Sequence, residues 1–459
     1  MTSTILKLSL AAFLVVSTGG LCAQEVSSAG GAEYMDFRDV VQDAKDKVFP
    51  SVVFINCLRE TLSSGRKVTG KVSGSGVLIS PDGELLTNWH VVDKAVEVRC
   101  LLSDGRGLNA RIIGTDKDTD LALLKLELPN KAEPLPYAKL GDSSLLKEGD
   151  FVMAMGAPWG LNRSVSIGII SCTKRFLPEN SEYSLWLQTD ASISPGNSGG
   201  PLINTNGEIV GINTRGVMYG GDVGFAIPSL TVSQIVDQIR KFGKVNWSWL
   251  GLQLQPIKDF DRNMYFDGDQ GVIVGSTDPD SPARNAGIKP RDRILKVGGM
   301  PITGLTEESL PIIRNHLGML PMHQEVEIEF QRGQEVMKVM VTPREKGRVE
   351  GEELDCPRWD MTVKTINQFD NPDLYFHRNT GVFIYGVNQP GNASNAGLRP
   401  NDIILTIDSQ EVNSLEDLKD MHKKALDNIE SQHKMVMTVL RNGLLRQIVL
   451  DFSRDYEKR

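Results

Sequence analysis

The chain has 459 residues, which is too many for one hydrophobic core, so about three domains of ~100–200 residues are expected. Its side chains are 40% hydrophobic and 24% charged, a globular composition that excludes a disordered polymer. The 50 basic and 58 acidic residues give a net charge of −8, and no basic stripe stands out, which argues against nucleic acid as the main partner.

Residues 1–23 have the pattern of a secretory signal peptide. Lys7 precedes an apolar run that is too short to span ~30 Å of hydrocarbon, and small residues lead to Ala23. Cleavage near Ala23 predicts a periplasmic or otherwise secreted protein. A retained signal-anchor and, because of Cys22, a lipid anchor are the alternatives, although Leu21 stands where lipoprotein signals usually carry a small residue.

Residues 190–202 read as a nucleophilic serine on a tight loop. Ser198 is surrounded by Gly196, Gly199 and Gly200, which allow positive φ and a close approach of substrate. Such a loop can aim the N–H groups of Gly196 and Ser198 at a developing oxyanion. An ordinary surface turn is the alternative, since Gly, Asn, Ser and Pro are common turn residues.

A serine nucleophile needs a base, and the histidines leave one candidate. Five of the six follow residue 300, so only His90 lies in the part of the chain that holds Ser198. By itself, His90 beside apolar residues would more often be a buried core histidine. Asp120 adjoins an apolar strand and is the predicted orienting carboxylate, whereas Asp116 and Asp118 are predicted to be solvated. The order His, Asp, Ser is the chymotrypsin-like order.

These residues carry a specific resemblance: residues 48–232 resemble the protease domain of the HtrA/Deg family of trypsin-like serine proteases. The resemblance implies two six-stranded antiparallel barrels with the site between them, and it carries over His90, Asp120 and Ser198 as the catalytic triad. Trp89 and the Pro158-Trp159 pair differ from the commonest sequence motif of the family, but neither difference is at a triad residue. The matching blocks are Gly74–Ile79, Thr87–Val92, Asp120–Leu123, Gly156–Leu161, Gly196–Leu202 and Gly224–Pro228.

Substrate contacts are expected in the second barrel. Ile212, Asn213 and Thr214 are predicted to form an edge strand along which an extended substrate pairs through its main chain. Ser192 stands six residues before Ser198, where trypsin-type enzymes of basic specificity place an aspartate. Its lack of charge predicts a small or medium aliphatic P1 residue (Val, Ala, Ile or Leu), as the resemblance also implies.

Arg175 has two interpretations. It stands 23 residues before Ser198, at the position of the regulatory-loop arginine in HtrA-like enzymes. An exposed, solvated charge is the alternative.

Four cysteines remain after Cys22 is removed, far fewer than in a disulfide-dense scaffold, and their spacing matches no zinc site. Cys57 and Cys100 continue period-two apolar patterns and are expected inside the first barrel. Two buried free thiols are favoured over one oxidised pair, which the neighbouring strands of the resembled barrel would also allow.

Two copies of one module follow an expected linker helix at 230–242. Residues 271–295 align without gaps with residues 381–405, at an offset of 110. The shared block Ala-Gly-(Ile/Leu)-x-Pro resembles PDZ domains of the bacterial permuted type.

The two PDZ copies differ at their expected carboxylate-binding loops. In the first copy, Leu250, Gly251 and Leu252 are predicted to capture a peptide C-terminus, opposed by a helix around 308–317. In the second copy Asp360 replaces the glycine, which puts a negative charge beside a ligand carboxylate and predicts that only the first copy binds C-terminal peptides.

The predicted architecture is mainly β: a chymotrypsin-like double β-barrel protease domain followed by two PDZ-like α+β domains. The boundaries are 1–23 for the signal peptide, 24–47 for an N-terminal leader, 48–242 for the protease domain with its linker helix, and 249–345 and 357–452 for the PDZ domains.

The predicted function is that of a secreted, ATP-independent serine endopeptidase that degrades unfolded or damaged envelope proteins in protein quality control and the stress response. The residues imply no cofactor and no metal, and the resemblance implies a homo-oligomer, a trimer or multiples of it. A chaperone or PDZ scaffold with a largely silent protease domain is the alternative.

Overall fold

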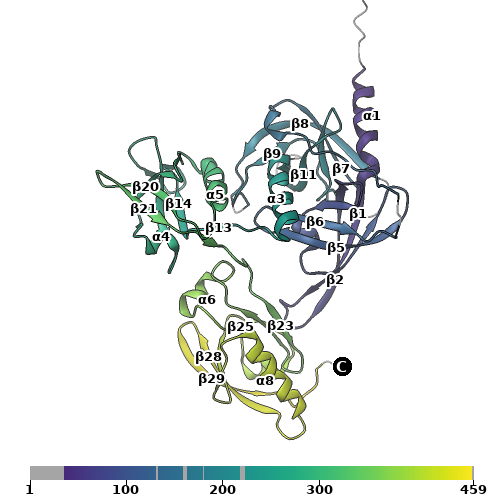
Figure 1. Cartoon of the computed structure of the whole chain (residues 1–459). Helices are drawn as coiled ribbons and strands as arrows, with labels where there is room; N and C mark the ends of the chain where they lie inside the picture. Colours follow the sequence, from purple (N-terminus) through teal and green to yellow (C-terminus); the bar gives the residue numbers. More distant parts are fainter. Residues whose placement is uncertain (1–35, 131–132, 159–162, 179, 218–222, 457–459) are drawn as a thin grey trace, which may run out of the picture.

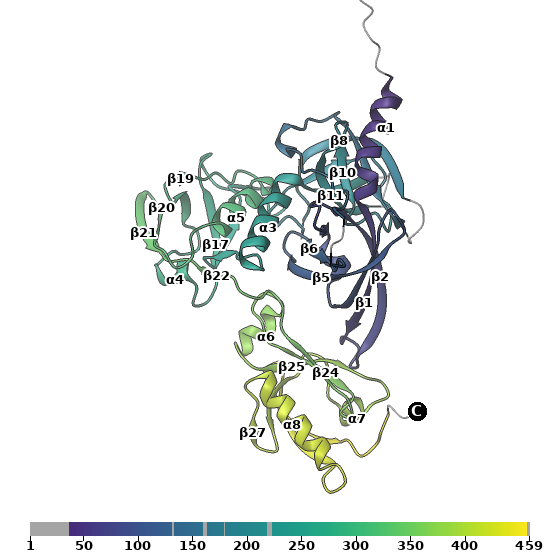
Figure 2. The ribbon, with the colours of Figure 1, turned by 45° about the vertical axis from the view of Figure 1, so that its right-hand side comes forward.

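The computed structural model describes residues 36–130, 133–158, 163–178, 180–217 and 223–456. It is mainly β, and Figure 1 shows three bodies: the predicted protease domain at upper right, the first predicted PDZ module at its left and the second below. Figure 2 shows the same arrangement from a second side, with the ends of β1 and β2 reaching toward the lower module.

The first barrel closes in the strand order β1-β2-β3-β6-β5-β4. Its interior is apolar, as the alternating pattern of the strands predicts. Cys57 and Cys100 lie inside it on the paired strands β1 and β4, and both are free, buried thiols. The elements are β1 (Val52–Thr61), β2 (Val68–Leu78), β3 (Glu84–Thr87), α2 (Trp89–Val92), β4 (Ala95–Leu101), β5 (Gly107–Asp116) and β6 (Leu121–Leu126).

The second barrel closes in the order β10-β11-β12-β9-β8-β7, so both six-stranded barrels of the predicted fold are present. The largest core cluster includes residues of both barrels and holds them together. The elements are β7 (Phe151–Gly156), β8 (Ser164–Arg175), β9 (Trp186–Thr189), β10 (Pro201–Asn204), β11 (Ile209–Val217) and β12 (Val223–Pro228). A 3₁₀ turn precedes each barrel, Phe49–Ser51 before β1 and Ser143–Leu145 before β7.

Two helices pack on the barrels. α1 (Phe37–Val48) places Ala44 and Val48 in the main core cluster, so this stretch is part of the protease domain, and its assignment to a leader was wrong. α3 (Ser229–Phe242) is the linker helix predicted from its apolar spacing, with Ile235 and Ile239 in the same cluster. Among the helices of the described ranges, none is long and apolar enough to cross a membrane.

The first PDZ module is a sheet in the order β14-β17-β18-β20-β21. Its own apolar core is separate from that of the barrels. The elements are β13 (Ser248–Trp249), β14 (Leu252–Gln255), β15 (Lys258–Asp259), β16 (Met264–Tyr265), β17 (Val272–Thr277), α4 (Pro282–Asn285), β18 (Arg293–Val297), β19 (Met300–Pro301), the 3₁₀ turn Glu307–Ser309, α5 (Leu310–Gly318), β20 (Val326–Arg332), β21 (Glu335–Val341) and β22 (Arg344–Glu345).

The second PDZ module repeats this plan with one strand more, in the order β23-β24-β25-β26-β28-β29. Its core is again separate. The elements are β23 (Glu353–Cys356), β24 (Met361–Thr365), α6 (Pro372–His377), β25 (Val382–Val387), α7 (Asn392–Ala396), β26 (Ile403–Ile407), β27 (Gln410–Glu411), α8 (Leu415–Asp427), β28 (Lys434–Arg441) and β29 (Leu444–Asp451).

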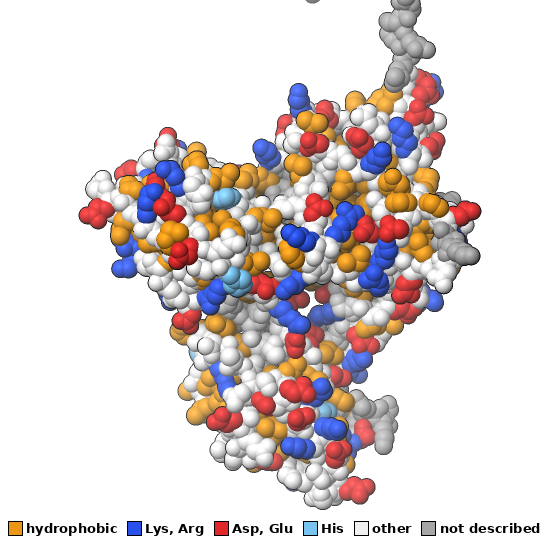
Figure 3. All heavy atoms as spheres, viewed as in Figure 1, with side chains coloured by type: hydrophobic (Ala, Val, Ile, Leu, Met, Phe, Trp, Pro, Cys, Tyr) orange, Lys and Arg blue, Asp and Glu red, His pale blue; other side chains and the backbone are white. Residues whose placement is uncertain are grey.

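The surface carries charges of both signs. On the face in Figure 3, lysines and arginines are interspersed with aspartates and glutamates over all three bodies.

Candidate active site

His90 and Asp120 come from the first barrel and form a close pair. His90 lies in the short helix α2 after β3, and Asp120 lies in the turn before β6, the strand that pairs with β3. His90 Nδ1 is 2.9 and 2.8 Å from the two carboxylate oxygens of Asp120. The pairing of β3 with β6 therefore brings the predicted base and carboxylate together, and it leaves the Nε2 edge of the imidazole available for a proton.

Asp120 is held by an unusually complete set of donors. Its φ is +57°, a left-handed conformation that costs energy for a residue with a Cβ. Its carbonyl accepts from Trp89 N and Asn88 Nδ2, both at 3.1 Å. Its carboxylate accepts from His90 N at 3.0 Å and from Thr214 Oγ1 at 2.5 Å. These bonds fix the carboxylate against the imidazole, and the Thr214 donor comes from the second barrel.

Ser198 sits on the loop before β10, in the second barrel, and closely approaches the first. Ser198 O accepts from Ser75 N at 2.8 Å. Gly199 has φ +85°, and a Cβ there would come within 2.2 Å of Ser75 O, so the sequence needs glycine at this position. The Ser198 hydroxyl donates to Thr214 O at 2.9 Å. Thr214 thus contacts both the serine and, through its side chain, the aspartate.

The loop also presents the two predicted oxyanion donors. The neighbouring N–H groups of Asn197, Gly199 and Gly200 are bonded to protein carbonyls. Within the described ranges, the N–H groups of Gly196 and Ser198 have no protein acceptor. Ser75 shapes this loop, because its hydroxyl donates to Gly196 O at 2.5 Å and accepts from Ala157 N at 2.8 Å. Among the described residues, the loop therefore offers two N–H donors without a protein acceptor, at Gly196 and Ser198.

The predicted substrate edge was placed too early in the chain. Ile212 pairs with β10 on one side and β12 on the other, and Asn213 exchanges main-chain hydrogen bonds with the 199–200 loop. Neither has a free edge, so the prediction was wrong for these two residues. A register irregularity follows Asn213, and from Arg215 to Val217 the strand pairs, within the part of the chain that the structure describes, with β12 alone. The open edge of β11 therefore begins at Thr214.

Ser192 and Arg175 lie on the same barrel. The Ser192 carbonyl accepts from Ser166 Oγ at 2.6 Å, which anchors the segment before Ser198 to β8. Arg175 ends β8, and its Nε donates to Gln188 Oε1 at 2.7 Å. The pKa of Glu308, in the first PDZ module, is lowered mainly by a hydrogen bond with Thr306, and the charge of Arg175 makes the smallest contribution.

A polar cluster that was not predicted from the sequence joins the aspartate loop to the segments before and after the first PDZ module. Lys346, in the segment between the two PDZ modules, lies 2.8 Å from Asp118 and 3.0 Å from the Tyr183 hydroxyl. Trp247 stacks on Tyr183 and donates to Asp116 at 3.0 Å. Burial raises the pKa of Asp116 to about 6. Asp116 and Asp118 are thus hydrogen-bonded to Trp247 and Lys346 of the two linkers, and the prediction that they are solvated was wrong.

The first PDZ module has an open groove where one was predicted. Leu250, Gly251 and Leu252 form the turn from β13 into β14, and Gly251 has φ +69°. The groove runs between this stretch and α5, with Leu317 on the helix side and Tyr183 from the protease domain at its rim. The predicted loop and helix therefore face one another, and a ligand there would touch the polar cluster.

Comparisons with known proteins agree with this geometry. Residues 74–212 match the model for a trypsin-like peptidase domain, and residues 238–318 and 360–451 match PDZ domain models. A probable periplasmic serine endoprotease DegP-like of Halomonas elongata is 37% identical over 359 residues, covering 76% of this chain and 73% of that protein. The protein of the same description from Pseudomonas savastanoi pv. phaseolicola is 37% identical over 391 residues, covering 83% and 78%.

Solved structures give the same picture. The HtrA-type protease AlgW with decapeptide superposes with a TM-score of 0.57 at 28% identity, covering 67% of this chain and 99% of that one. A second structure, the serine endoprotease from Yersinia pestis, gives a TM-score of 0.52 at 30% identity, covering 66% and 97%.

Proposed function

The chain belongs to the family of DegP-like periplasmic serine endoproteases, and from this premise we propose that His90, Asp120 and Ser198 are its catalytic triad. The observation that carries the proposal is the paired His90 imidazole and Asp120 carboxylate, joined through Thr214 to the Ser198 loop. Geometry of this kind is how a triad is recognised, whatever the fold that carries it.

The three residues and the loop N–H groups have distinct roles in the reaction. The Ser198 hydroxyl rotates from Thr214 O to His90 Nε2, which takes its proton as the oxygen attacks the peptide carbonyl carbon. Asp120 holds the ring tautomer and stabilises the imidazolium. The N–H groups of Gly196 and Ser198 bind the oxyanion, a contribution of ~3–4 kcal/mol per donor in comparable sites. His90 then gives the proton to the leaving amine, and a water activated by His90 hydrolyses the acyl-enzyme.

The substrates are unfolded or damaged proteins of the envelope. The open edge of β11, from Thr214, can add only an extended strand, so a folded substrate would have to expose one. Ser192 supplies no charge for a Lys or Arg side chain, which leaves small or medium aliphatic residues at P1. Mapping the cleavage sites on denatured casein tests this specificity: Val, Ala, Ile and Leu should dominate before the cut, and a Lys/Arg majority would refute it.

The first PDZ module binds C-terminal peptides, and Arg175 relays their presence to the protease domain. The open groove between Gly251 and α5 supports the first assignment, and the place of Arg175 at the end of β8, where the family has its regulatory-loop arginine, supports the second. The functional unit is a homo-oligomer, a trimer or a multiple of it. The exposed Phe37 and Phe151, whose rings contact one another at a tilted angle, offer an apolar surface for such contacts, and light scattering would measure the mass.

One observation favours a second candidate function, a chaperone or PDZ scaffold with a silent protease domain. The Ser198 hydroxyl donates to Thr214 O, which is a resting rather than an attacking geometry. Casein degradation by the wild type and by Ser198→Ala separates the two functions. A protease loses degradation in the variant, whereas a chaperone suppresses aggregation equally in both proteins and degrades casein in neither.

A further inference from the structure

The two PDZ modules have equivalent loops, which allows their grooves to be compared residue by residue. Gly251 O accepts from Asp278 N in the first module, and Asp360 O accepts from Asn388 N in the second, both at 2.9 Å. Both loop residues have positive φ, +69° and +57°. The aspartate therefore stands at the glycine position, and β24 of the second module corresponds to β14 of the first.

The side chain of Asp360 turns toward α7. Its Oδ2 accepts from Asn392 N at 2.8 Å. In the first module a Cβ on Gly251 would come within 2.1 Å of Ser281, whereas the second module carries Gly391 at the matching place. Relative to the first module, Asp360 replaces Gly251 and Gly391 replaces Ser281. The second replacement makes room for the aspartate side chain against α7.

The grooves differ at the edge where a ligand strand would pair. In the described residues of the first module β14 pairs with β17 alone, so its other edge is open. In the second module both edges of β24 are taken, because β25 pairs on one side and β23 (Glu353–Cys356) on the other. β23 also lies against α8, the helix that corresponds to α5. The chain's own strand thus fills the place between strand and helix where a PDZ ligand binds.

β23 also has the chain direction and the side-chain pattern of a bound PDZ peptide. It runs antiparallel to β24 and ends at the carboxylate loop, as the C-terminus of a bound peptide does. Cys356, its last residue, is fully buried in the core of the module, and Leu354 packs against that core two positions earlier. The Cys356 carbonyl accepts from Trp359 N of the loop at 3.2 Å, in place of a terminal carboxylate oxygen.

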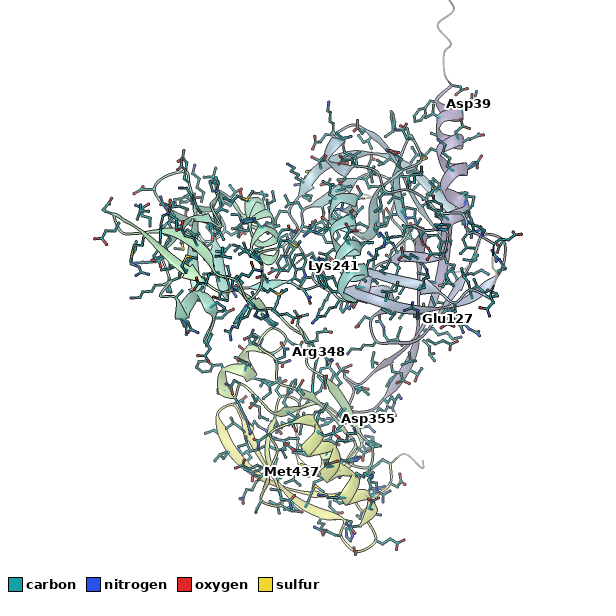
Figure 4. All side chains as sticks on the ribbon, in the orientation of Figure 1. Asp39, Glu127, Lys241, Arg348, Asp355 and Met437 are labelled. Atoms are coloured by element: carbon teal, nitrogen blue, oxygen red, sulfur yellow. The ribbon has the colours of Figure 1, made fainter. Side chains whose placement is uncertain are left out.

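The protease domain holds this strand in the groove. Glu353 lies 2.6 Å from Lys94, which follows His90 by four residues, and 3.5 Å from Lys364 on β24. Thr362 of β24 donates to Leu62 O at the end of β1. Figure 4 labels Asp355 on this strand, on the side of the lower module that faces the first barrel. Displacing β23 therefore breaks contacts to the protease domain.

We propose that the groove of the second PDZ module is a peptide-binding site occupied by the chain's own residues 353–356. Its competing ligand is an extended peptide with a small apolar C-terminal residue and an apolar residue two positions before it. The peptide binds only molecules in which β23 has detached. Its apparent affinity is therefore the intrinsic affinity multiplied by the fraction of such molecules. The charge of Asp360 is not what separates the two modules.

The test uses the full chain carrying Ser198→Ala, so that peptides are not cleaved, and a fluorescent peptide that copies residues 351–356 with a free C-terminus. Leu354→Asp puts a charge on the face of β23 that enters the groove, and Leu354→Met is the matched control. Hydrogen–deuterium exchange locates the bound peptide at residues 361–365 or 252–255. Leu354→Asp should bind at 361–365 about tenfold or more tightly than the Leu354→Met control.

Glu353→Lys is the second variant, because it removes the Lys94 and Lys364 ion pairs without changing the apolar face of β23. It should give a smaller gain at the same residues, and normal exchange in β25–β29 shows that the module is folded. Equal binding at 361–365 in the parent and in both release variants would overturn the proposal. So would a folded Leu354→Asp chain that binds the peptide at 252–255 only, or β23 and β24 amides that exchange freely in the parent.

Discussion

In the proposed catalytic centre, the two residues from the first barrel are bonded to one another, whereas the serine hydroxyl from the second barrel is bonded to Thr214 O and not to the histidine. His90 and Asp120 already make their mutual hydrogen bonds, and Thr214 of the second barrel donates a further hydrogen bond to the Asp120 carboxylate. Ser198 instead donates to Thr214 O. The parts that stabilise charge are thus preorganised, while the nucleophile still has to turn. Substitutions that separate these two halves test the account.

The largest effect is expected at the nucleophile and its base. Ser198→Ala and His90→Ala should each lower kcat/KM for peptide hydrolysis by about 10⁵-fold, and the double variant should be little worse than either, because the two act as a unit. Steady-state kinetics on an aliphatic P1 peptide measures this. Losses that add in the double variant would show that the residues act independently.

Asp120→Asn should lower kcat by about 10⁴-fold, because an amide group cannot stabilise the imidazolium and favours the wrong tautomer. The fold is expected to survive, since the main-chain bonds of Asp120 to Trp89 and Asn88 do not involve the carboxylate. Circular dichroism is the control. A kcat within tenfold of the wild type would contradict the role of the carboxylate.

Thr214→Val should lower kcat about 10- to 100-fold, because hydrogen bonds to charged groups contribute roughly 1.5–3 kcal/mol. Thr214→Ser is the matched control, since it retains the hydroxyl that donates to Asp120. If Thr214→Val keeps its activity and Thr214→Ser loses it, the methyl packing of Thr214 matters and not its hydrogen bond to Asp120.

The smallest effect is expected at Ser75. Ser75→Ala removes the hydroxyl that joins Gly196 O to Ala157 N, so the loop with the oxyanion donors is less well ordered. One neutral hydrogen bond is worth about 1 kcal/mol, so kcat should fall about fivefold with KM unchanged. A change in KM alone would mean that Ser75 shapes substrate binding instead.

The sequence predicted those parts of the site that rest on short local motifs. His90, Asp120 and Ser198 each lie in a distinctive block, and the doubled PDZ pattern is visible as a repeat. Thr214 and Lys346 were missed as partners because their contacts, to Asp120 and Asp118, span 94 and 228 residues. No local pattern encodes such distances.

The errors have the same origin. Ile212 and Asn213 look like an edge strand, but the irregularity after Asn213 decides which part of β11 is free. β23 was not predicted at all, because it has only four residues and its contacts are to β24 and α8, which lie later in the chain. Both follow from packing that becomes visible only in three dimensions.

The most direct test of the central claim is covalent labelling of the wild-type chain with a fluorophosphonate, mapped by mass spectrometry. The account predicts a single adduct on Ser198, with a labelling rate that collapses in His90→Ala. An adduct elsewhere, or equal labelling rates with and without His90, would contradict it.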